Sequence, residues 1–314
     1  MSRPVTGRRV RRGRGRRAAL GVVVAGALVG AVVVAGAPAG AASGSRTATT
    51  EYYVALGDSL AAGVGADPGR GYVDDVYTQE KKKLHGLVLE NLSCSGATTT
   101  SMIDGPGCSY TTGSQLGDAE AFLESHAGQV AFITIDIGAN DVVGCTDTST
   151  LTIDQDCVNQ GMQTIGDNLP VILSGLEAAG GSTPVVGMSY YDPFLAAWIL
   201  GSSAGKSLAE QSVTLLGNLN SLLESDYGAA DTADVADAFH SSDFSRGGRY
   251  EGTAVPVNVG RICHWTLMCS EGDIHADDLG HAHIARTFEK ILGPLVGGQR
   301  AATASRGSGA RVGG

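Results

Sequence analysis

Residues Val130–Ile137 read VAFITIDI and end at Gly138, and this is the most strand-like stretch of the 314-residue chain. Val, Ile and Thr fill most of it, and their branched side chains favour extended backbone. A nearly continuous apolar run is typical of a strand that is covered on both faces of a parallel sheet. We therefore expect this segment to belong to a buried parallel sheet.

Further strand and helix patterns alternate on both sides of this segment. Short apolar runs predict strands at Tyr52–Leu56, Leu87–Leu92 and Pro184–Ser189. Apolar residues three and four positions apart predict helices at Tyr72–Leu84, Val158–Ala179, Lys206–Glu224 and Asp277–Leu292. This alternation predicts an α/β fold with three layers, α/β/α, around a central parallel sheet, in one domain over residues 51–296.

Four short motifs lie at junctions between the expected strands, loops and helices. They are Gly57-Asp58-Ser59-Leu60, Ser95-Gly96, Gly138-Ala139-Asn140-Asp141 and Asp273-Ile274-His275. Because the carboxyl ends of parallel strands share one edge of a sheet, these motifs should converge there. Together they supply a nucleophile, a base, an unobstructed backbone N–H and a side-chain amide, which are the parts of an acyl-transfer site.

These motifs, in this order, resemble the SGNH hydrolases, also called GDSL esterases and lipases, in particular secreted actinobacterial members. The resemblance spans about residues 52–292. It implies a flavodoxin-like hydrolase fold, Ser59 as nucleophile and His275 as general base and acid. It further implies an oxyanion hole formed by the Ser59 and Gly96 backbone N–H groups and the Asn140 side chain, and no metal or organic cofactor.

One position departs from the family pattern. The family places an acid three residues before the histidine, where this chain has Gly272, and the nearest acid is Asp273. Asp273 could orient the His275 ring from a loop. Alternatively a main-chain carbonyl of Ser270, Glu271 or Trp265 orients it, leaving a Ser–His dyad.

The first 41 residues have the pattern of a signal peptide. Eight arginines precede an apolar stretch from Ala18 to about Ala37, which ends near the small-residue site Ala39-Gly40-Ala41. We expect export by the Sec route or, because of Arg16-Arg17, the twin-arginine route; a retained membrane anchor is the rival reading. Residues 42–50 read as a linker and residues 297–314 as a disordered tail.

The charge of the chain is divided unevenly. The net charge is −10, but beyond the leader 14 basic residues face 32 acidic ones, a net charge of −18. Such a body repels phosphate backbones, so we expect no nucleic-acid partner.

Six cysteines fall into three close couples, and they fit an oxidising compartment. The simplest pairing is Cys94–Cys108, Cys145–Cys157 and Cys263–Cys269. The alternatives are free buried thiols or a metal site, although the absence of a C-x-x-C spacing disfavours zinc.

The expected function is a secreted serine carboxylester hydrolase, a lipase or esterase, that acts on acyl esters or lipids as a monomer. Phe194, Trp198 and Leu200, in the apolar run after the fourth strand, would hold an acyl chain or else belong to the core. A carbohydrate acetylesterase and a non-catalytic cell-surface binding protein on the same fold are the alternatives.

Three other patterns in the sequence do not indicate a functional site. Residues 201–205 match G-x-S-x-G formally, but no strand precedes them, so a Gly/Ser loop is the better interpretation. The same segment is one residue short of a P-loop. His281 and His283 are two positions apart in a helix, which does not suit metal ligation, and we expect both at the surface.

Overall fold

A computed structural model describes residues 50–228 and 231–309 of the chain, with side-chain environments up to residue 296. The predicted signal peptide and nearly all of the predicted linker lie outside the described residues. Within the described ranges, no helix is long and apolar enough to cross a membrane.

Five parallel strands form the centre of the domain. They are β1 (Glu51–Gly57), β2 (Leu87–Asn91), β3 (Val130–Asp136), β6 (Val185–Met188) and β7 (Thr232–Ala233), in the spatial order β2-β1-β3-β6-β7. Ala55 lies opposite both Asn91 and Thr134, which fixes the register of the three strands nearest the predicted site. The predicted parallel sheet is confirmed, and the short strand β7 was not foreseen.

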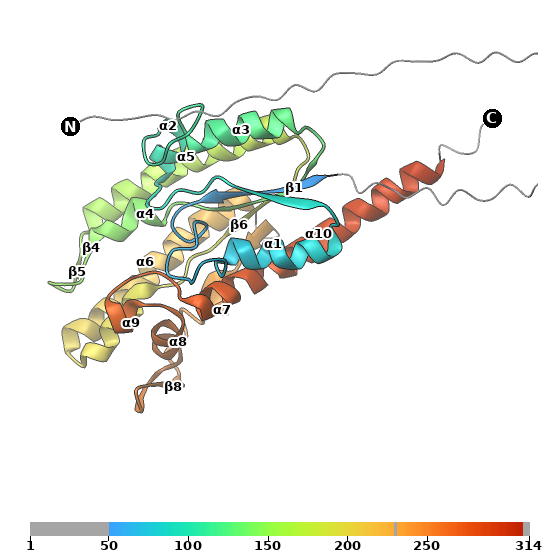
Figure 1. Cartoon of the computed structure of the whole chain (residues 1–314). Helices are drawn as coiled ribbons and strands as arrows, with labels where there is room; N and C mark the ends of the chain where they lie inside the picture. The colour runs from blue at the N-terminus through green and yellow to red at the C-terminus, as the bar shows by residue number, and fades with distance from the viewer. Residues whose placement is uncertain (1–49, 229–230, 310–314) are drawn as a thin grey trace, which may run out of the picture. The chain divides into compact units, whose positions relative to one another are not determined.

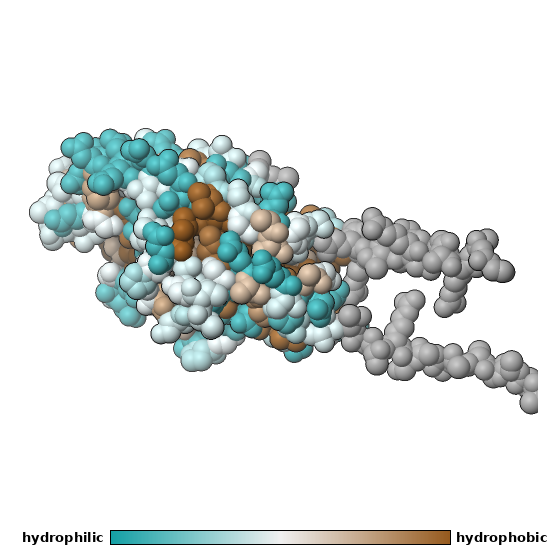
Figure 2. Space-filling view, turned by 90° about the horizontal axis from the view of Figure 1, so that it is seen from above, coloured by the Kyte–Doolittle hydropathy of each residue, from teal (hydrophilic) through white to brown (hydrophobic). Residues whose placement is uncertain are grey.

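Helices cover both faces of the sheet. In Figure 1, α3 (Gln115–Ser125) and α5 (Gln155–Gly180) lie along its upper side, and α1 (Tyr72–Lys83) and α10 (Asp278–Gly309) along its lower side. The helix α6 (Ser203–Tyr227) packs against α5 and β6. The three-layer α/β/α architecture is therefore confirmed. Figure 2, which looks down on the upper side, shows a largely hydrophilic face with one compact hydrophobic area.

The core explains why the strands are so apolar. Val54, Leu56, Phe132, Ile133 and Ile135 are fully buried, because helices pack on both faces of β1 and β3. Parallel sheets covered on both sides need such continuous apolar runs.

Shorter elements decorate the carboxyl edge of the sheet, where the site was expected. They are α2 (Thr99–Asp104), α4 (Ala139–Val142), the 3₁₀ helices η1 (Val143–Cys145) and η2 (Pro193–Leu200), α7 (Val235–Ala238), α8 (Val257–Trp265), α9 (Met268–Glu271) and the antiparallel pairs β4–β5 (Thr146–Asp147, Thr152–Ile153) and β8–β9 (Arg246–Tyr250, Thr253–Pro256). The sequence patterns predicted neither of the two hairpins, and they also missed the helices α3 and α8. The apolar patterns of these segments are short or irregular.

Two expectations can be compared with the local structure. Ser202, the serine of the G-x-S-x-G match, caps α6 by accepting a hydrogen bond from Gly205 N–H, so it belongs to a helix start rather than to a nucleophile turn. The backbone of α10 is helical as far as Gly309, inside the tail predicted over 297–314, and residues 310–314 lie outside the described residues. An Ala-rich stretch at 301–304 favours helix, which accounts for this extension.

Two glycines offer a matched test of packing. A Cβ on Gly187, in β6, would overlap the ring of Tyr227, whereas a Cβ on Gly217, in α6, would meet open space. We expect Gly187→Ala to lower the free energy of unfolding by about 1–3 kcal/mol. Gly217→Ala should raise it by about 0.5–1 kcal/mol, because alanine is the better helix former. Urea unfolding monitored by circular dichroism measures both, and equal effects would contradict the packing described.

Candidate active site

The turn after β1 carries Ser59, which is almost buried. Gly57 ends the strand with φ +144°, and a side chain there would overlap the carboxyl group of Asp136. The turn is then fixed by Asp58, whose Oδ1 accepts a hydrogen bond from Leu60 N–H at 2.9 Å. Position 57, directly before Asp58 and Ser59, therefore requires glycine.

The loop that follows Ser59 is fastened to α10. The Nε2 atom of His281 lies 3.0 Å from the carbonyl oxygen of Val64, and its Nδ1 accepts from Tyr72 N–H at 3.1 Å. Asp278 Oδ1 accepts from Asp67 N–H at 2.8 Å. These bonds hold the Ser59 loop against the start of the last helix.

His281 is fully buried, so the prediction that it lies at the surface was wrong. Its neighbours at three-, four- and seven-residue spacing, Ile284, Ala285 and Phe288, are also buried, which places it on the inner face of α10. Burial lowers the pKa of His281, and a neutral ring is what allows Nδ1 to accept the Tyr72 hydrogen bond. His283 is half-buried and stacks on Trp265 with ring centroids 3.7 Å apart.

His275 lies in the loop before α10. Its Nδ1 is 2.5 Å from Asp273 Oδ1, and the same oxygen accepts the backbone N–H of His275 at 3.0 Å. Partial burial acts to raise the pKa of Asp273, but these hydrogen bonds outweigh it and lower the pKa below its ordinary value. Of the competing carbonyls, that of Trp265 accepts a hydrogen bond from Asp277 N–H instead.

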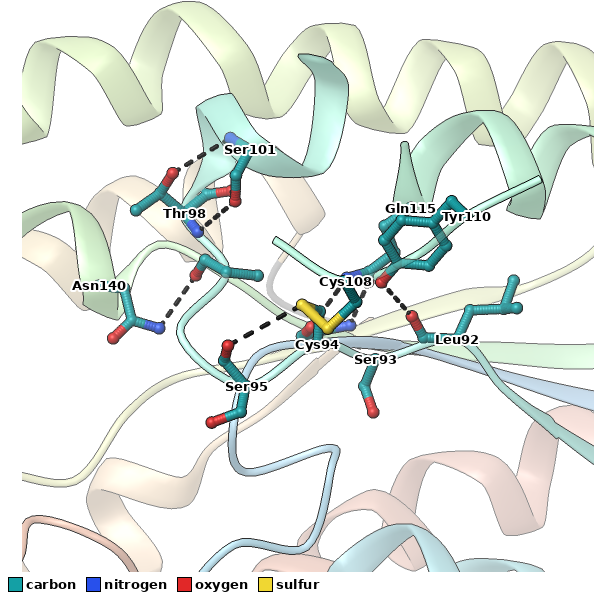
Figure 3. The surroundings of a disulfide bond; sticks show 12 residues. Leu92, Ser93, Cys94, Ser95, Thr98, Ser101, Cys108, Tyr110, Gln115 and Asn140 are labelled. Atoms are coloured by element: carbon teal, nitrogen blue, oxygen red, sulfur yellow. Dashed lines mark hydrogen bonds between the residues drawn. A yellow bond between two sulfur atoms is a disulfide. The ribbon is translucent and has the colours of Figure 1, made fainter. Parts of the chain in front are cut away.

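Asn140, in the short helix α4, contacts the loop after β2 that carries Gly96. Figure 3 shows Asn140 beside this loop, around the Cys94–Cys108 disulfide. Asn140 Nδ2 donates to the carbonyl oxygen of Ala97 at 2.9 Å. Gly96 has φ +81° and open space around it, so its backbone is unobstructed. Cys94 N–H donates to the carbonyl oxygen of Gly57 at 3.0 Å, which ties this loop to the end of β1.

A cavity of about 660 Å³, counting its open mouth, brings Ser59, Asn140 and His275 together. Its wall is largely apolar and comes from α4, η1, η2 and α6, with Val142, Val143, Phe194, Leu215, Leu216 and Leu219 among the lining residues. Gly96 is not among the lining residues.

The structure places only one of the three predicted acyl-chain residues in this cavity. Phe194 lines it, whereas Trp198 packs on Phe244 with ring centroids 5.5 Å apart and Leu200 is 58% exposed. In the 3₁₀ helix η2, side chains three positions apart share a face, so Trp198, four positions after Phe194, lies on a different face from it.

Comparison with known protein families identifies the family of this chain. The model of the GDSL-like lipase/acylhydrolase family matches residues 55–283. The chain belongs to this family. A search of curated proteins found no significant match.

Solved structures agree with this GDSL-like hydrolase in fold. The lipase Lip_vut3 from a goat rumen metagenome is 17% identical, with a TM-score of 0.52 over 77% of this chain and 97% of that chain. A GDSL-like lipase structure from Parabacteroides merdae is 16% identical, with a TM-score of 0.51 over 78% and 96%. An extracellular lipase from Streptomyces rimosus is 20% identical, with a TM-score of 0.48 over 78% and 100%. At these identities the likeness concerns the fold.

Three disulfides brace the loops of this hydrolase. Cys94–Cys108, Cys145–Cys157 and Cys263–Cys269 are bonded, which is the pairing that the spacing suggested. The first lies beside Gly96, the second follows α4, and the third joins α8 to α9 ahead of His275. Each therefore shortens the free length of a loop at the site.

Two supporting residues of the hydrolase were missed in the sequence. Gln115 is buried, and its side-chain amide pairs with Gly57: Oε1 accepts from Gly57 N–H at 2.7 Å and Nε2 donates to Gly57 O at 3.0 Å. Asp141 accepts the backbone N–H and the hydroxyl of Thr99 at 2.9 and 2.7 Å. No local pattern marks Gln115, whereas Asp141 stands beside Asn140 in a motif that the sequence had singled out.

A buried carboxyl group also lines the cavity. Asp192 Oδ1 accepts from Phe194 N–H at 2.9 Å and caps η2, and Oδ2 accepts from Ser212 Oγ at 2.7 Å. Burial raises the pKa of Asp192 to about 7, and the hydrogen bonds offset only part of that effect.

This burial predicts a pH dependence of stability. The folded pKa of Asp192 exceeds its unfolded value, so its contribution is present at acidic pH and is lost as the pH rises through about 7. Asn at this position cannot ionise and keeps the cap. We expect the free energy of unfolding of Asp192→Asn, relative to the wild type, to increase by about 2–3 kcal/mol between pH 5 and pH 8.

The control for this prediction is Asp243→Asn. Hydrogen bonds from Ser245 lower the pKa of that exposed carboxyl group, so the variant should show no such gain at high pH. Urea unfolding at both pH values measures the difference. A gain shared by both variants, or absent from both, would contradict the assignment to Asp192.

Proposed function

We propose that this chain is a secreted serine carboxylester hydrolase that cleaves acyl esters through an acyl-enzyme intermediate. The observation that carries the proposal is one largely apolar cavity lined by Ser59, Asn140 and His275, with Asp273 on the Nδ1 side of the His275 ring. A nucleophile, a base and an oriented third group around one cavity form the arrangement used for acyl transfer.

In the proposed reaction, Ser59 Oγ attacks the ester carbonyl while His275 Nε2 takes its proton. The same proton is then given to the leaving alcohol, and water repeats the two steps on the acyl-enzyme. Asp273, bonded to Nδ1, fixes the tautomer that leaves Nε2 free to accept and stabilises the imidazolium that forms.

The backbone N–H groups of Ser59 and Gly96 and the Asn140 amide would stabilise the oxyanion. An amide has two N–H donors, and one of Asn140 is already held by the Ala97 carbonyl. That bond orients the other toward the reacting oxygen before substrate arrives, which is where preorganised donors gain their effect.

The cavity wall favours an acyl chain as the part of the substrate that enters. Leu215, Leu216 and Leu219 of α6 line the cavity together with Val142 and Phe194, so a hydrocarbon chain would find an apolar surface there. This wall supports lipids or medium-chain esters over a carbohydrate acetylesterase, whose sugar would need polar partners. Three disulfides and the Arg-rich, apolar leader support export.

We expect Ser59→Ala to abolish hydrolysis of p-nitrophenyl butyrate. Asp273→Asn should lower kcat by about 10²–10⁴-fold with little change in KM, because the His275 ring loses its orienting acceptor. Glu271→Gln is the control, since that exposed side chain lies in the same segment and is expected to change nothing. If Ser59→Ala hydrolyses the ester at the wild-type rate, the proposed function is refuted. If Asp273→Asn does so, the enzyme works with a Ser–His dyad and Asp273 is not its third member.

Chain-length preference tests the acyl cavity. Leu215→Trp should fill it and lower kcat/KM for p-nitrophenyl decanoate at least about tenfold relative to the acetate ester, because the long chain loses its space. Leu222→Trp, the same change two turns along α6 and outside the lining residues, should leave the ratio unchanged, and so should Trp198→Ala. If Leu222→Trp or Trp198→Ala shifts the ratio as much as Leu215→Trp, the acyl chain lies elsewhere.

A further inference from the structure

Two buried carboxyl groups lie directly beneath the Ser59 turn. Asp58 is 2% exposed and Asp136, the last residue of β3, is fully buried. Their carboxyl groups lie close together, because they accept hydrogen bonds from consecutive backbone N–H groups of the turn. Neither residue has a part in the proposed proton transfers.

Two carboxylates that share a buried site repel each other, and no salt bridge of the described residues involves either group. One of the two acids is therefore expected to be neutral in the folded protein. Burial and the neighbouring charge of Asp58 raise the pKa of Asp136 well above its ordinary value, and burial raises the pKa of Asp58 as well. Asp136 is consequently the acid that keeps its proton.

The other oxygen contacts of the pair bind the turn itself. Asp58 Oδ1 accepts from Leu60 N–H at 2.9 Å, and Asp136 Oδ2 accepts from Ala61 N–H at 3.3 Å. Leu60 and Ala61 are the two residues after the nucleophile, so the acid pair holds the backbone on which Ser59 sits.

Two tyrosines complete the cluster. Tyr190 OH donates to Asp58 Oδ2 at 2.9 Å, and Tyr72 OH donates to Asp136 Oδ1 at 2.5 Å. The pair thus links the end of β1 to α1 and to the segment after β6.

Resting on the proposed function, we propose that Asp136 is a positioning residue for the nucleophile, acting as a neutral acid beside Asp58 that accepts from the Ser59 turn. Loss of its proton places two negative charges in one buried site, where they repel each other and push the two side chains apart. The turn then loses its anchor, and kcat falls on the alkaline side.

The groups that face the pair from the surrounding elements do not replace that proton. They are Tyr53 on β1, Tyr72 on α1, Tyr190 and Tyr191 after β6, Tyr227 on α6, and His275 ahead of α10. Burial raises the pKa of each of these tyrosines, so they remain neutral while the acid pair titrates. His275 is the one cationic candidate among them, and its charge appears during turnover.

The test is the pH profile of kcat for Asp136→Asn and Asp136→Leu, with p-nitrophenyl butyrate. Asn keeps an oxygen that accepts from Ala61 N–H and cannot ionise, so kcat near pH 7 should stay within about threefold of wild type and the alkaline fall should move to higher pH or vanish. Leu offers no acceptor, and kcat should fall about tenfold or more with KM unchanged. Circular dichroism at each pH restricts the comparison to folded protein, and if Asp136→Leu does not fold, Asp136→Asn alone decides.

Asp226→Asn is the matched control. Burial raises the pKa of that carboxyl group too, but it lies at the carboxyl end of α6, beyond the amino ends of the strands, so its pH profile should match the wild type. The proposal would be overturned if the alkaline fall of kcat came at the same pH in Asp136→Asn and in the wild type. It would also be overturned if Asp226→Asn shifted that fall as much as Asp136→Asn does. Ser59→Ala, run in parallel, separates the two ideas: activity in that variant refutes the proposed function, whereas its loss beside unchanged Asp136 variants refutes only the positioning role.

Discussion

The site depends on a close contact between two segments from opposite ends of the domain. Gly65, in the loop after Ser59, lies so close to the carbonyl of Ala276 that a side chain at residue 65 would overlap it. His281 adds two hydrogen bonds across the same contact, to Val64 and Tyr72. Because Ala276 follows His275 directly, this contact sets where the imidazole lies relative to the serine. The carboxyl edge of the sheet carries Ser59, and this contact sets the position of His275 relative to it.

The interior beneath the site is unusually acidic for a core. Asp58, Asp136 and Asp192 are all buried, and burial raises the pKa of each. Each is nevertheless held by at least two donors, and several of those donors are backbone N–H groups of turns or caps. Acidic side chains therefore hold the irregular backbone near the ends of β1, β3 and β6 by accepting hydrogen bonds from its N–H groups. Their burial makes those turns sensitive to proton loss, and this sensitivity is the cost of the arrangement.

Sequence patterns predicted the elements whose character is local. VAFITIDI became β3, the spaced apolar residues became α1, α5, α6 and α10, and the close cysteine couples became the three disulfides. Convergence of Ser59 and Asn140 followed from the parallel topology, because β1 and β3 are neighbours, whereas the position of His275 depends on the contact of its loop with residues 64–72. The supporting residues of the site could not be predicted, because their roles depend on tertiary neighbours. The side-chain amide of Gln115 makes the hydrogen bonds to Gly57 that a neighbouring backbone would otherwise make. Asp136 comes close to Asp58 only after β1 and β3 pair. The His281 error is instructive, since the helical spacing of Ile284, Ala285 and Phe288 already marked its inner face.

The disulfides have a consequence for how the molecule matures. Their cysteines are separated by 14, 12 and 6 residues, and no bridge encloses another. Each partner is thus the nearest thiol along the chain, and each ring can close independently of the other two. The order of oxidation is then immaterial, and mispaired species that need reshuffling are disfavoured by loop entropy. A chain arranged in this way can form its disulfides with little help from a thiol isomerase.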